Sequence, residues 1–350
     1  FWLKPRQFRL EPYVSMLQAC STRLWSRRCW GQSWRCADYQ KGKSWRCTVH
    51  QASAAYRLSA EDLQSFHENG YLIVKNFLNR QEVDLLREAL ETDKSLQDQQ
   101  IQLNDQNQGK TKLALWSKPG DGTLGMLTRS RRVVETVEAM LRGPVVHYHS
   151  KNLVKYPEEG GVRNWHQDYG YWYKDYFLTP DMLTAYFAID RQTMENGCIK
   201  LLKGSNRLGR IDHVAVGDQQ GAELERVELA KKRCEEVYFV AAPSDALFFH
   251  SLTLHSSRGN FSSERRLVFA SCFTREDNVQ YKDAYIPCFP CPVVDDDAII
   301  GDGRVHLTSE EDKVMLRAAD GAEAARKDAG FQEAGIKELA DKHWRDGGKF

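Results

Sequence analysis

The stretch Ala242-Pro-Ser-Asp-Ala-Leu-Phe-Phe-His-Ser-Leu-Thr-Leu-His255 runs from a Pro-Ser-Asp turn into an apolar segment that ends at a histidine. Short runs rich in aromatic and β-branched residues, bounded by turn-forming residues, are typical of β-strands. The same texture recurs through the second half of the chain, which is therefore predicted to form β-sheet. The runs are His147–Tyr156, Leu183–Asp190, Glu236–Ala241, Ala246–His250 and Leu267–Phe273.

The region before these strands carries helical signals. Ser59 followed by Asp62 is a variant of the capping box and predicts a helix that continues to about His67. Helices followed by many short strands indicate an α+β chain whose core is a sheet sandwich or jelly roll with flanking helices. The other elements expected here are a strand at 71–75, helices at 80–95 and 131–142, and a surface loop at 98–112.

The N-terminal stretch differs from the rest of the chain. Residues 1–55 carry ten Lys and Arg against two acids, whereas the remainder has an excess of acids. An Arg-rich, acid-poor leader is typical of organelle transit peptides, and a disordered leader without a targeting role is the alternative. We therefore predict three parts: a leader at 1–57, a folded domain at 58–300, and a helical extension at 301–350 to which no chemistry is assigned.

The composition argues against several classes of protein. No run of 18 apolar residues occurs, so no membrane-spanning helix is expected. The mildly acidic body lacks the basic face of a nucleic-acid-binding protein. Cys288 and Cys291 have redox or zinc spacing, but no second pair with ligand spacing accompanies them. A reducing compartment is expected, so the protein is predicted to be soluble and cytoplasmic or organellar.

A candidate metal site comes from three residues. His166 and Asp168 flank Gln167, and in an extended segment residues i and i+2 point to the same face. His255 follows 87 residues after Asp168, at the end of an apolar strand, and can complete a set of two imidazoles and one carboxylate. Such a set leaves three positions open on octahedral iron(II), enough for a bidentate 2-oxo acid and dioxygen. Catalytic zinc accepts the same ligands and stays an alternative.

An arginine after the third ligand favours the iron interpretation. Arg266 follows His255 by eleven residues, and its guanidinium fork can hold the far carboxylate of a 2-oxo acid. Ser257 can add a hydroxyl to the same carboxylate. Arg265 is the rival for this role, because a strand sends neighbouring side chains to opposite faces and only one of the two can point inward.

These motifs together resemble the phytanoyl-CoA dioxygenase family over about residues 58–290. The resemblance implies a double-stranded β-helix core that uses iron(II), 2-oxoglutarate and dioxygen, with ascorbate as a supporting reductant. It also implies hydroxylation of an unactivated carbon of a small molecule, with release of succinate and CO2. The matching residues are His166-Gln167-Asp168, Glu195-Asn196-Gly197-Cys198, Lys203-Gly204-Ser205, Pro243-Ser244-Asp245-Ala246, His255-Ser256-Ser257, Asn260 and Arg266.

By family position, His166, Asp168 and His255 are the implied catalytic iron ligands, and Arg266 with Ser257 is the implied co-substrate clamp. Tyr186 stands where the family often has an aromatic residue lining the co-substrate pocket. The chain departs from the family pattern at two positions that are not ligands. Ser244 replaces a common glycine and Asn206 a common histidine, which concerns the geometry of the turns.

The substrate is less well indicated than the metal. The rings from Tyr169 to Tyr173 and at Tyr176 can box a cationic or zwitterionic substrate, or they can pack a lid or a core. Lys151 shares a strand face with His147 and His149 and is a candidate for contacting the co-substrate or substrate. His250 is a rival of His255. Alternatives to an oxygenase are a metal-dependent cupin-like hydrolase or isomerase, and a non-catalytic β-sandwich binding protein. The oligomeric state is not predicted.

Overall fold

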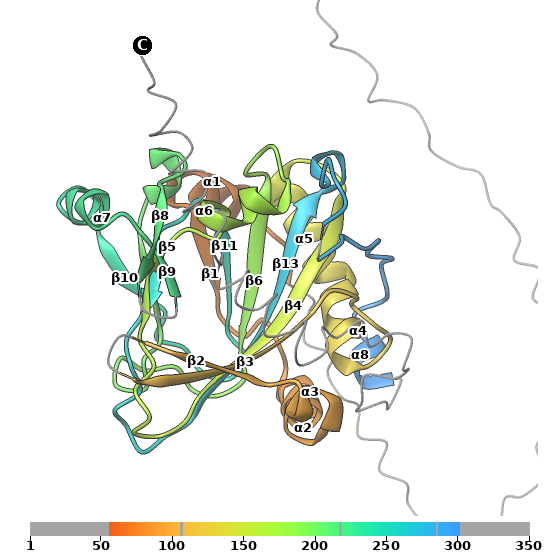
Figure 1. The fold of residues 1–350 in the computed structure, drawn as a ribbon. Helices are drawn as coiled ribbons and strands as arrows, with labels where there is room; N and C mark the ends of the chain where they lie inside the picture. The colour runs from red at the N-terminus through yellow and green to blue at the C-terminus, as the bar shows by residue number, and fades with distance from the viewer. Residues whose placement is uncertain (1–55, 106–107, 217–218, 285, 302–350) are drawn as a thin grey trace, which may run out of the picture. The chain divides into compact units, whose positions relative to one another are not determined.

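A computed structural model describes residues 56–301 of the chain, except 106–107, 217–218 and 285 (Figure 1). Apart from residues 56, 57 and 301, the predicted leader at 1–57 and extension at 301–350 lie outside the described residues. All described residues belong to one of the two compact units into which the chain divides. Among them, no helix is long and apolar enough to cross a membrane.

The described strands form a large antiparallel sheet, a smaller one and a hairpin. The large sheet has the order β1-β11-β6-β13-β4-β3-β2, the smaller sheet has the order β10-β7-β12-β5, and β8 pairs with β9. The strands of the large sheet are β1 (Tyr71–Val74), β2 (Ile101–Asn104), β3 (Lys110–Trp116), β4 (Val145–Lys155), β6 (Met182–Ala188), β11 (Ala246–His250) and β13 (Arg266–Arg275). The others are β5 (Arg163–His166), β7 (Ile199–Leu202), β8 (His213–Val216), β9 (Gln219–Ala222), β10 (Glu236–Tyr238) and β12 (His255–Ser257).

Five of the eight described α-helices, α1 to α5, come before β4 in the chain. At the start of the first helix, Ser59 Oγ accepts a hydrogen bond from the Asp62 amide at 3.0 Å, and Asp62 Oδ2 accepts one from the Ser59 amide at 3.2 Å. The predicted capping box is thereby confirmed. The helices are α1 (Ala60–Asn69), α2 (Arg80–Thr92), α3 (Lys94–Asp98), α4 (Thr123–Arg129), α5 (Arg131–Leu141), α6 (Tyr169–Trp172), α7 (Leu224–Lys231) and α8 (Ala298–Gly301).

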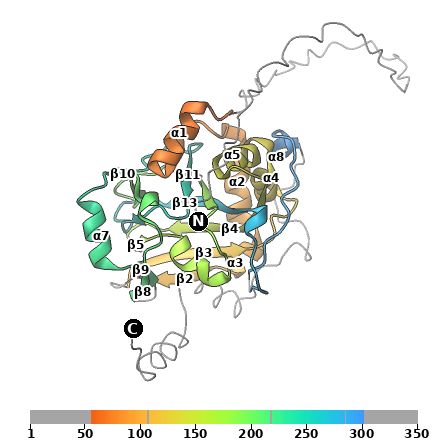
Figure 2. The same cartoon turned by 90° about the horizontal axis from the view of Figure 1, so that it is seen from above.

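The large sheet is covered on both faces, as alternation along β6 shows. Leu183 and Phe187 belong to a core that joins this sheet to helices α2, α4 and α5, and Figure 2 shows those helices gathered together. Tyr186 and Ala188 point the other way, into a second core shared with Leu201 of the smaller sheet. Two sheets packed face to face with helices outside confirm the predicted α+β jelly roll.

The prediction of a surface loop at 98–112 is wrong. This segment instead ends α3 and forms most of the β2–β3 hairpin, which adds two strands to the edge of the large sheet. Leu103 and Leu113 pack together as a small apolar cluster. Their strand neighbours Gln102 and Lys112 point to the other face and are exposed or partly exposed, so the Gln- and Asn-rich composition concealed a strand periodicity.

The two closely spaced cysteines are both partly buried. Cys288 and Cys291 are free thiols, and burial raises the pKa of each to about 12. A thiol with a raised pKa is a poor nucleophile, because attack needs the thiolate.

Candidate active site

The three candidate ligands meet at one buried point. His166 ends β5 and His255 begins β12, and the two residues are direct cross-strand partners. Their Nε2 atoms lie 3.9 Å and 3.7 Å from Oδ1 of Asp168. One donor atom from each residue lies within 4.8 Å of the others. The arrangement therefore offers two nitrogens and one carboxylate oxygen to a single ion.

The backbone conformation that places His166 beside Asp168 differs from the one predicted from the sequence. We expected His166 and Asp168 to share a face of one extended segment. The structure shows that β5 ends at His166, and that Asp168 has helical backbone angles (φ −58°, ψ −47°) and begins α6. A turn of the chain, and not strand alternation, brings the carboxylate beside the imidazole.

Hydrogen bonds to backbone carbonyls fix the tautomer of both imidazoles. Nδ1 of His166 lies 2.7 Å from the Asn164 carbonyl, and Nδ1 of His255 lies 2.9 Å from the Thr253 carbonyl. Each Nδ1 therefore donates, which leaves the Nε2 lone pair directed at the metal position. Burial lowers the pKa of both histidines, so both are neutral near pH 7, the form that binds a metal.

Two hydroxyls orient the carboxylate. Tyr171 donates to Oδ1 of Asp168 at 3.0 Å, and Thr184 on β6 donates to Oδ2 at 3.0 Å. Hydrogen bonds of this kind hold a ligand in its productive orientation. The sequence analysis assigned this role to neither Tyr171 nor Thr184. Thr184 comes from β6 of the large sheet, which is distant from Asp168 along the chain.

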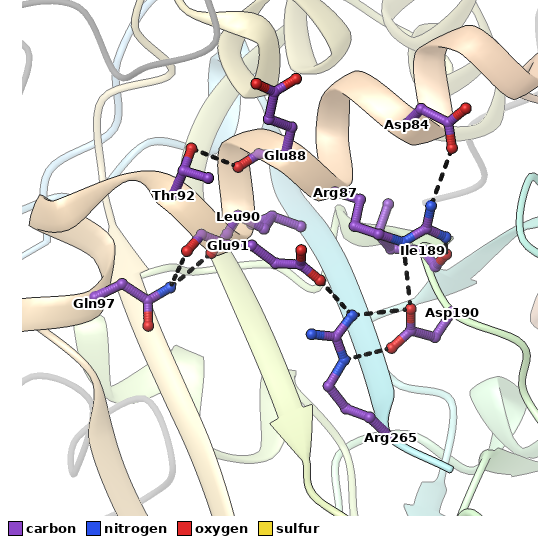
Figure 3. A network of polar contacts seen from close by, with 10 residues as sticks. All are labelled: Asp84, Arg87, Glu88, Leu90, Glu91, Thr92, Gln97, Ile189, Asp190 and Arg265. Carbon is purple, nitrogen blue, oxygen red and sulfur yellow. Dashed lines mark hydrogen bonds and ion pairs between the residues drawn. The ribbon is translucent and has the colours of Figure 1, made fainter.

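The cavity beside these residues is lined from both sheets, and Arg266 reaches it. The Arg266 side chain is buried, lines the cavity and donates from Nη1 to the Gly197 carbonyl. Arg265 points away: its guanidinium lies 2.8 Å from Asp190 and 2.6 Å from Glu91, as Figure 3 shows. Alternation along β13 therefore directs Arg266, and not its neighbour, into the cavity.

The other predicted co-substrate residues also reach this cavity. Ser257, Tyr186 and Lys151 all line it. The Tyr186 hydroxyl is buried and has no hydrogen-bond partner among the described residues. The ammonium of Lys151 lies 5.7 Å from the ring centroid of Trp172.

Three histidines that were considered from the sequence lie outside the cavity lining. His147 is enclosed, with Nδ1 2.8 Å from the Ser117 carbonyl and Nε2 2.8 Å from the Ser150 hydroxyl. His149 is buried among aromatic rings. His250 accepts a hydrogen bond from the Leu252 amide at 3.1 Å. His250 is thus not placed to compete with His255 for the metal position.

The aromatic cluster after Asp168 is mostly core. Tyr169 and Trp172 are buried and pack with Tyr148 and Phe177. Among the clustered rings, Tyr171 lines the cavity, while its hydroxyl is held by Asp168. Of the two interpretations of these rings, packing describes Tyr169 and Trp172.

Comparison with known proteins identifies the family. The family model described as Phytanoyl-CoA dioxygenase (PhyH) matches residues 66–268, more than half of the chain. The chain belongs to this family. This family is one of Fe(II)/2-oxoglutarate-dependent oxygenases, in agreement with the resemblance stated above, and iron and 2-oxoglutarate are the cofactor and co-substrate of that enzyme class.

Two curated relatives and one solved structure illustrate the similarity. L-Proline trans-4-hydroxylase of Streptomyces griseoviridis is 30% identical over 174 residues, 45% of this chain and 65% of the relative, so the match spans less than two thirds of that protein. Ectoine dioxygenase of Nocardia farcinica is 24% identical over 232 residues, 61% and 78% of the two chains. The apo crystal structure of EctD from S. alaskensis superposes with a TM-score of 0.57 at 17% identity, covering 68% of this chain and 87% of that one.

The middle residue of the family's H-x-D motif ties the metal loop to two other segments. Gln167 donates from Nε2 to the Gly209 and Leu252 carbonyls, at 2.8 Å and 2.7 Å, and its Oε1 accepts from the Ile211 amide at 2.7 Å. Its own amide donates to Nε2 of His213 at 2.9 Å. The loop that carries the candidate ligands is therefore anchored on both sides by a residue that the sequence did not mark as functional.

Two further basic residues line the cavity and were not assigned a role from the sequence. Lys155 follows Lys151 by four residues on β4, which places both on the same face of the strand. Arg163 begins β5 and lies 6.0 Å from the ring centroid of Tyr171. The spacing of the two lysines was the available signal, and among the described residues that line the cavity Asp168 is the only acid.

Proposed function

We propose that this family member is an Fe(II)/2-oxoglutarate-dependent hydroxylase of a small molecule. It would insert oxygen at an unactivated carbon and release succinate and CO2. The observation that carries the proposal is the convergence of His166, Asp168 and His255 in one buried cavity that also contains Arg266.

The residues present fit iron(II) and 2-oxoglutarate. Two neutral imidazoles and one carboxylate are the donor set of non-haem iron(II) oxygenases, and they leave coordination positions for other ligands. The Arg266 Nε and the Tyr186 hydroxyl are buried without partners among the described residues. Buried polar groups need hydrogen-bond partners, and a bound carboxylate would supply them.

Each residue would have a defined task. His166, Asp168 and His255 would hold the metal, with the Asp168 carboxylate oriented by Tyr171 and Thr184. When bound there together with 2-oxoglutarate, iron(II) supplies the activation of dioxygen that hydroxylation requires.

The cavity wall would control access and orientation. Arg266 and Ser257 would hold the far carboxylate of the co-substrate, since a guanidinium fork binds a carboxylate through two hydrogen bonds. Leu113, Leu153 and Phe249 are apolar lining residues that would exclude water from the reacting atoms.

Succinate release tests the proposal. The protein is incubated with Fe(II), ascorbate, 2-oxoglutarate and a panel of small acids, amines and lipids, beginning with amino acids because the named relatives include a proline hydroxylase. A product heavier by one oxygen is sought by mass spectrometry together with succinate. Asp168→Ala should abolish both signals. Turnover that survives this substitution would refute the assignment of the metal ligands.

Two neighbouring arginines provide a matched test of the co-substrate clamp. Arg266→Lys loses the bidentate contact and should raise the 2-oxoglutarate requirement by about tenfold or more. Arg265→Lys changes the ion pairs with Glu91 and Asp190 outside the cavity and should leave that requirement unchanged. The reverse pattern would transfer the role to Arg265.

A further inference from the structure

A second buried cation faces the candidate co-substrate clamp. Lys155 on β4 is the direct cross-strand partner of Arg266 on β13, so both side chains leave the large sheet on the same face. Both line the cavity, and their exposed fractions are 1% and 2%. Two like charges directly opposite one another in a sheet repel, and burial strengthens that repulsion.

Among the described residues, no acid forms a direct ion pair with either cation; the buried Asp105, whose oxygens accept from the Gly109 and Val162 amides, acts on Lys155 only through its nearby charge. Lys155 donates to the Ser257 hydroxyl at 2.7 Å and to the Arg258 carbonyl at 2.6 Å, both neutral acceptors. Arg266 donates to the neutral Gly197 carbonyl, and its Nε is unpaired. Two buried cations with a single nearby carboxylate are not fully compensated, which is unfavourable, so this pair is expected to be completed by an anion.

The lysine also sets the direction of the serine hydroxyl. Because Lys155 donates to Ser257 Oγ, a lone pair of that oxygen is occupied and its own proton is directed elsewhere. Ser257 lines the same cavity, so its hydroxyl can donate to an anion there. Burial, and then the neighbouring Arg266, hold the pKa of Lys155 well below its usual range, and an anion between the two cations would reverse that effect.

We propose that Lys155 and Arg266 form a paired cationic clamp, in which Lys155 is a second positioning residue for the far carboxylate of the co-substrate. The inference rests on the proposed function, because it assigns that carboxylate to 2-oxoglutarate. Lys155 contributes its charge and orients Ser257 as a donor, while Arg266 contributes the fork. The clamp therefore selects a 2-oxo acid that carries a second carboxylate.

A purely structural lysine would behave differently. Its two hydrogen bonds join β4 to the segment after β12, so a structural role predicts that its removal lowers stability and weakens all ligands alike. The clamp predicts that removal affects only a ligand with a far carboxylate. Oxalate chelates a metal through two carboxylates but has no group that reaches the clamp, so oxalate separates the two roles.

Binding to the full-length protein loaded with Mn(II) provides the test without turnover. Isothermal titration measures the affinities for 2-oxoglutarate and for oxalate in the wild type, in Lys155→Met and in Lys110→Met. Lys110 is exposed at the start of β3 and is the matched control. We expect Lys155→Met to weaken 2-oxoglutarate by about tenfold or more and to leave oxalate within about twofold. Lys110→Met should change neither affinity.

The possible results separate this inference from the proposed function. If Lys155→Met binds 2-oxoglutarate as the wild type does, or loses oxalate equally, the clamp is wrong and the proposed function stands. A wild type that fails to bind 2-oxoglutarate refutes the proposed function itself. Lys155→Gln is measured in parallel in case the methionine variant does not fold, and failure of both variants to fold would assign Lys155 a structural role and overturn the proposal.

Discussion

The hydroxyls of Thr184 and Tyr171 orient the Asp168 carboxylate of the proposed metal site. The Thr184 hydroxyl donates to Oδ2 of Asp168 at 3.0 Å from a strand of the large sheet, so it links the candidate ligand to the opposite layer of the fold. A ligand that loses such a partner keeps its charge but loses its fixed orientation. The affinity for the metal then falls although every ligand is present.

Thr184→Val tests this effect of one hydroxyl. Valine has nearly the same shape, so the fold should persist while metal affinity falls by about 10- to 100-fold. Thr136→Val is the matched control, because Thr136 is also buried but lies on α5 and donates to the Arg132 carbonyl. Titration with Mn(II) measures both variants. Equal metal affinities in the two variants would show that Thr184 does not orient the carboxylate.

The buried His147 makes stability depend on pH. Burial is the largest cause that lowers its pKa from 6.5 to about 3. The unfolded chain therefore binds this proton more readily, so the contribution of neutral His147 is complete above pH 6.5 and is lost as the pH falls toward 3. At pH 5 the loss is about 2 kcal/mol.

Denaturant unfolding at pH 7 and pH 5 measures this loss. Other buried histidines also titrate, so the wild type should lose more than the contribution of His147 alone. His147→Gln should be less stable at pH 7 but should lose about 2 kcal/mol less than the wild type between the two pH values. An equal loss in both proteins would contradict the prediction.

The turn before β11 carries backbone strain at Ser244. Its φ angle is 110°, in a region that suits glycine and disfavours residues with a Cβ. The sequence had marked this position as a departure from the family pattern, which commonly has glycine here. The neighbouring Asp245 holds the turn, since its carboxylate accepts from the Asn76 and Ala242 amides and from Lys75.

Ser244→Gly should therefore stabilise the protein. The gain expected is about 1 kcal/mol, because relief of the strained φ exceeds the entropy that an added glycine costs. Ser244→Ala keeps the Cβ and should bring no gain. Denaturant midpoints measure the stability of both variants. A loss of stability in Ser244→Gly would show that the turn is not strained.

At the scale of the whole folded unit, the candidate metal site joins the two sheets. His166 and His255 belong to the smaller sheet, whereas Thr184 and Arg266 belong to the large one. A metal ion held here would bind the folded state and not the unfolded chain. Its binding energy therefore becomes stability of the whole unit.

Metal binding should raise the melting temperature. Mn(II) at 100 times its Kd adds about 2.7 kcal/mol, which for a unit of this size corresponds to about 5–10 °C. Removal of the metal by a chelator should reverse the shift. Asp168→Ala should show no such shift, and a shift of the wild-type size in that variant would place the metal elsewhere.

Local features of the chain could be predicted from the sequence, because they depend on neighbouring residues. The capping box at Ser59, the strands β4, β6, β10, β11 and β13, and the order of His166, Asp168, His255 and Arg266 all belong to this group, whereas the short strands β5, β7, β8, β9 and β12 were not predicted. The 98–112 segment shows the limit of composition. Its polar residues indicated a loop, yet pairing of β2 with β3 made it a hairpin at the edge of the large sheet.

Which side chains face each other was decided only by the tertiary structure. The order of motifs indicated that two histidines and an aspartate belong together, but pairing of β12 with β5 is what sets His255 beside His166. The choice of Arg266 over Arg265 and the position of Lys155 opposite Arg266 depend on the register of β13 against β4. Strand alternation is a local property that the sequence contains. Register is set by packing between residues far apart in the chain, and a shift of one residue would turn every side chain of the strand to the other face.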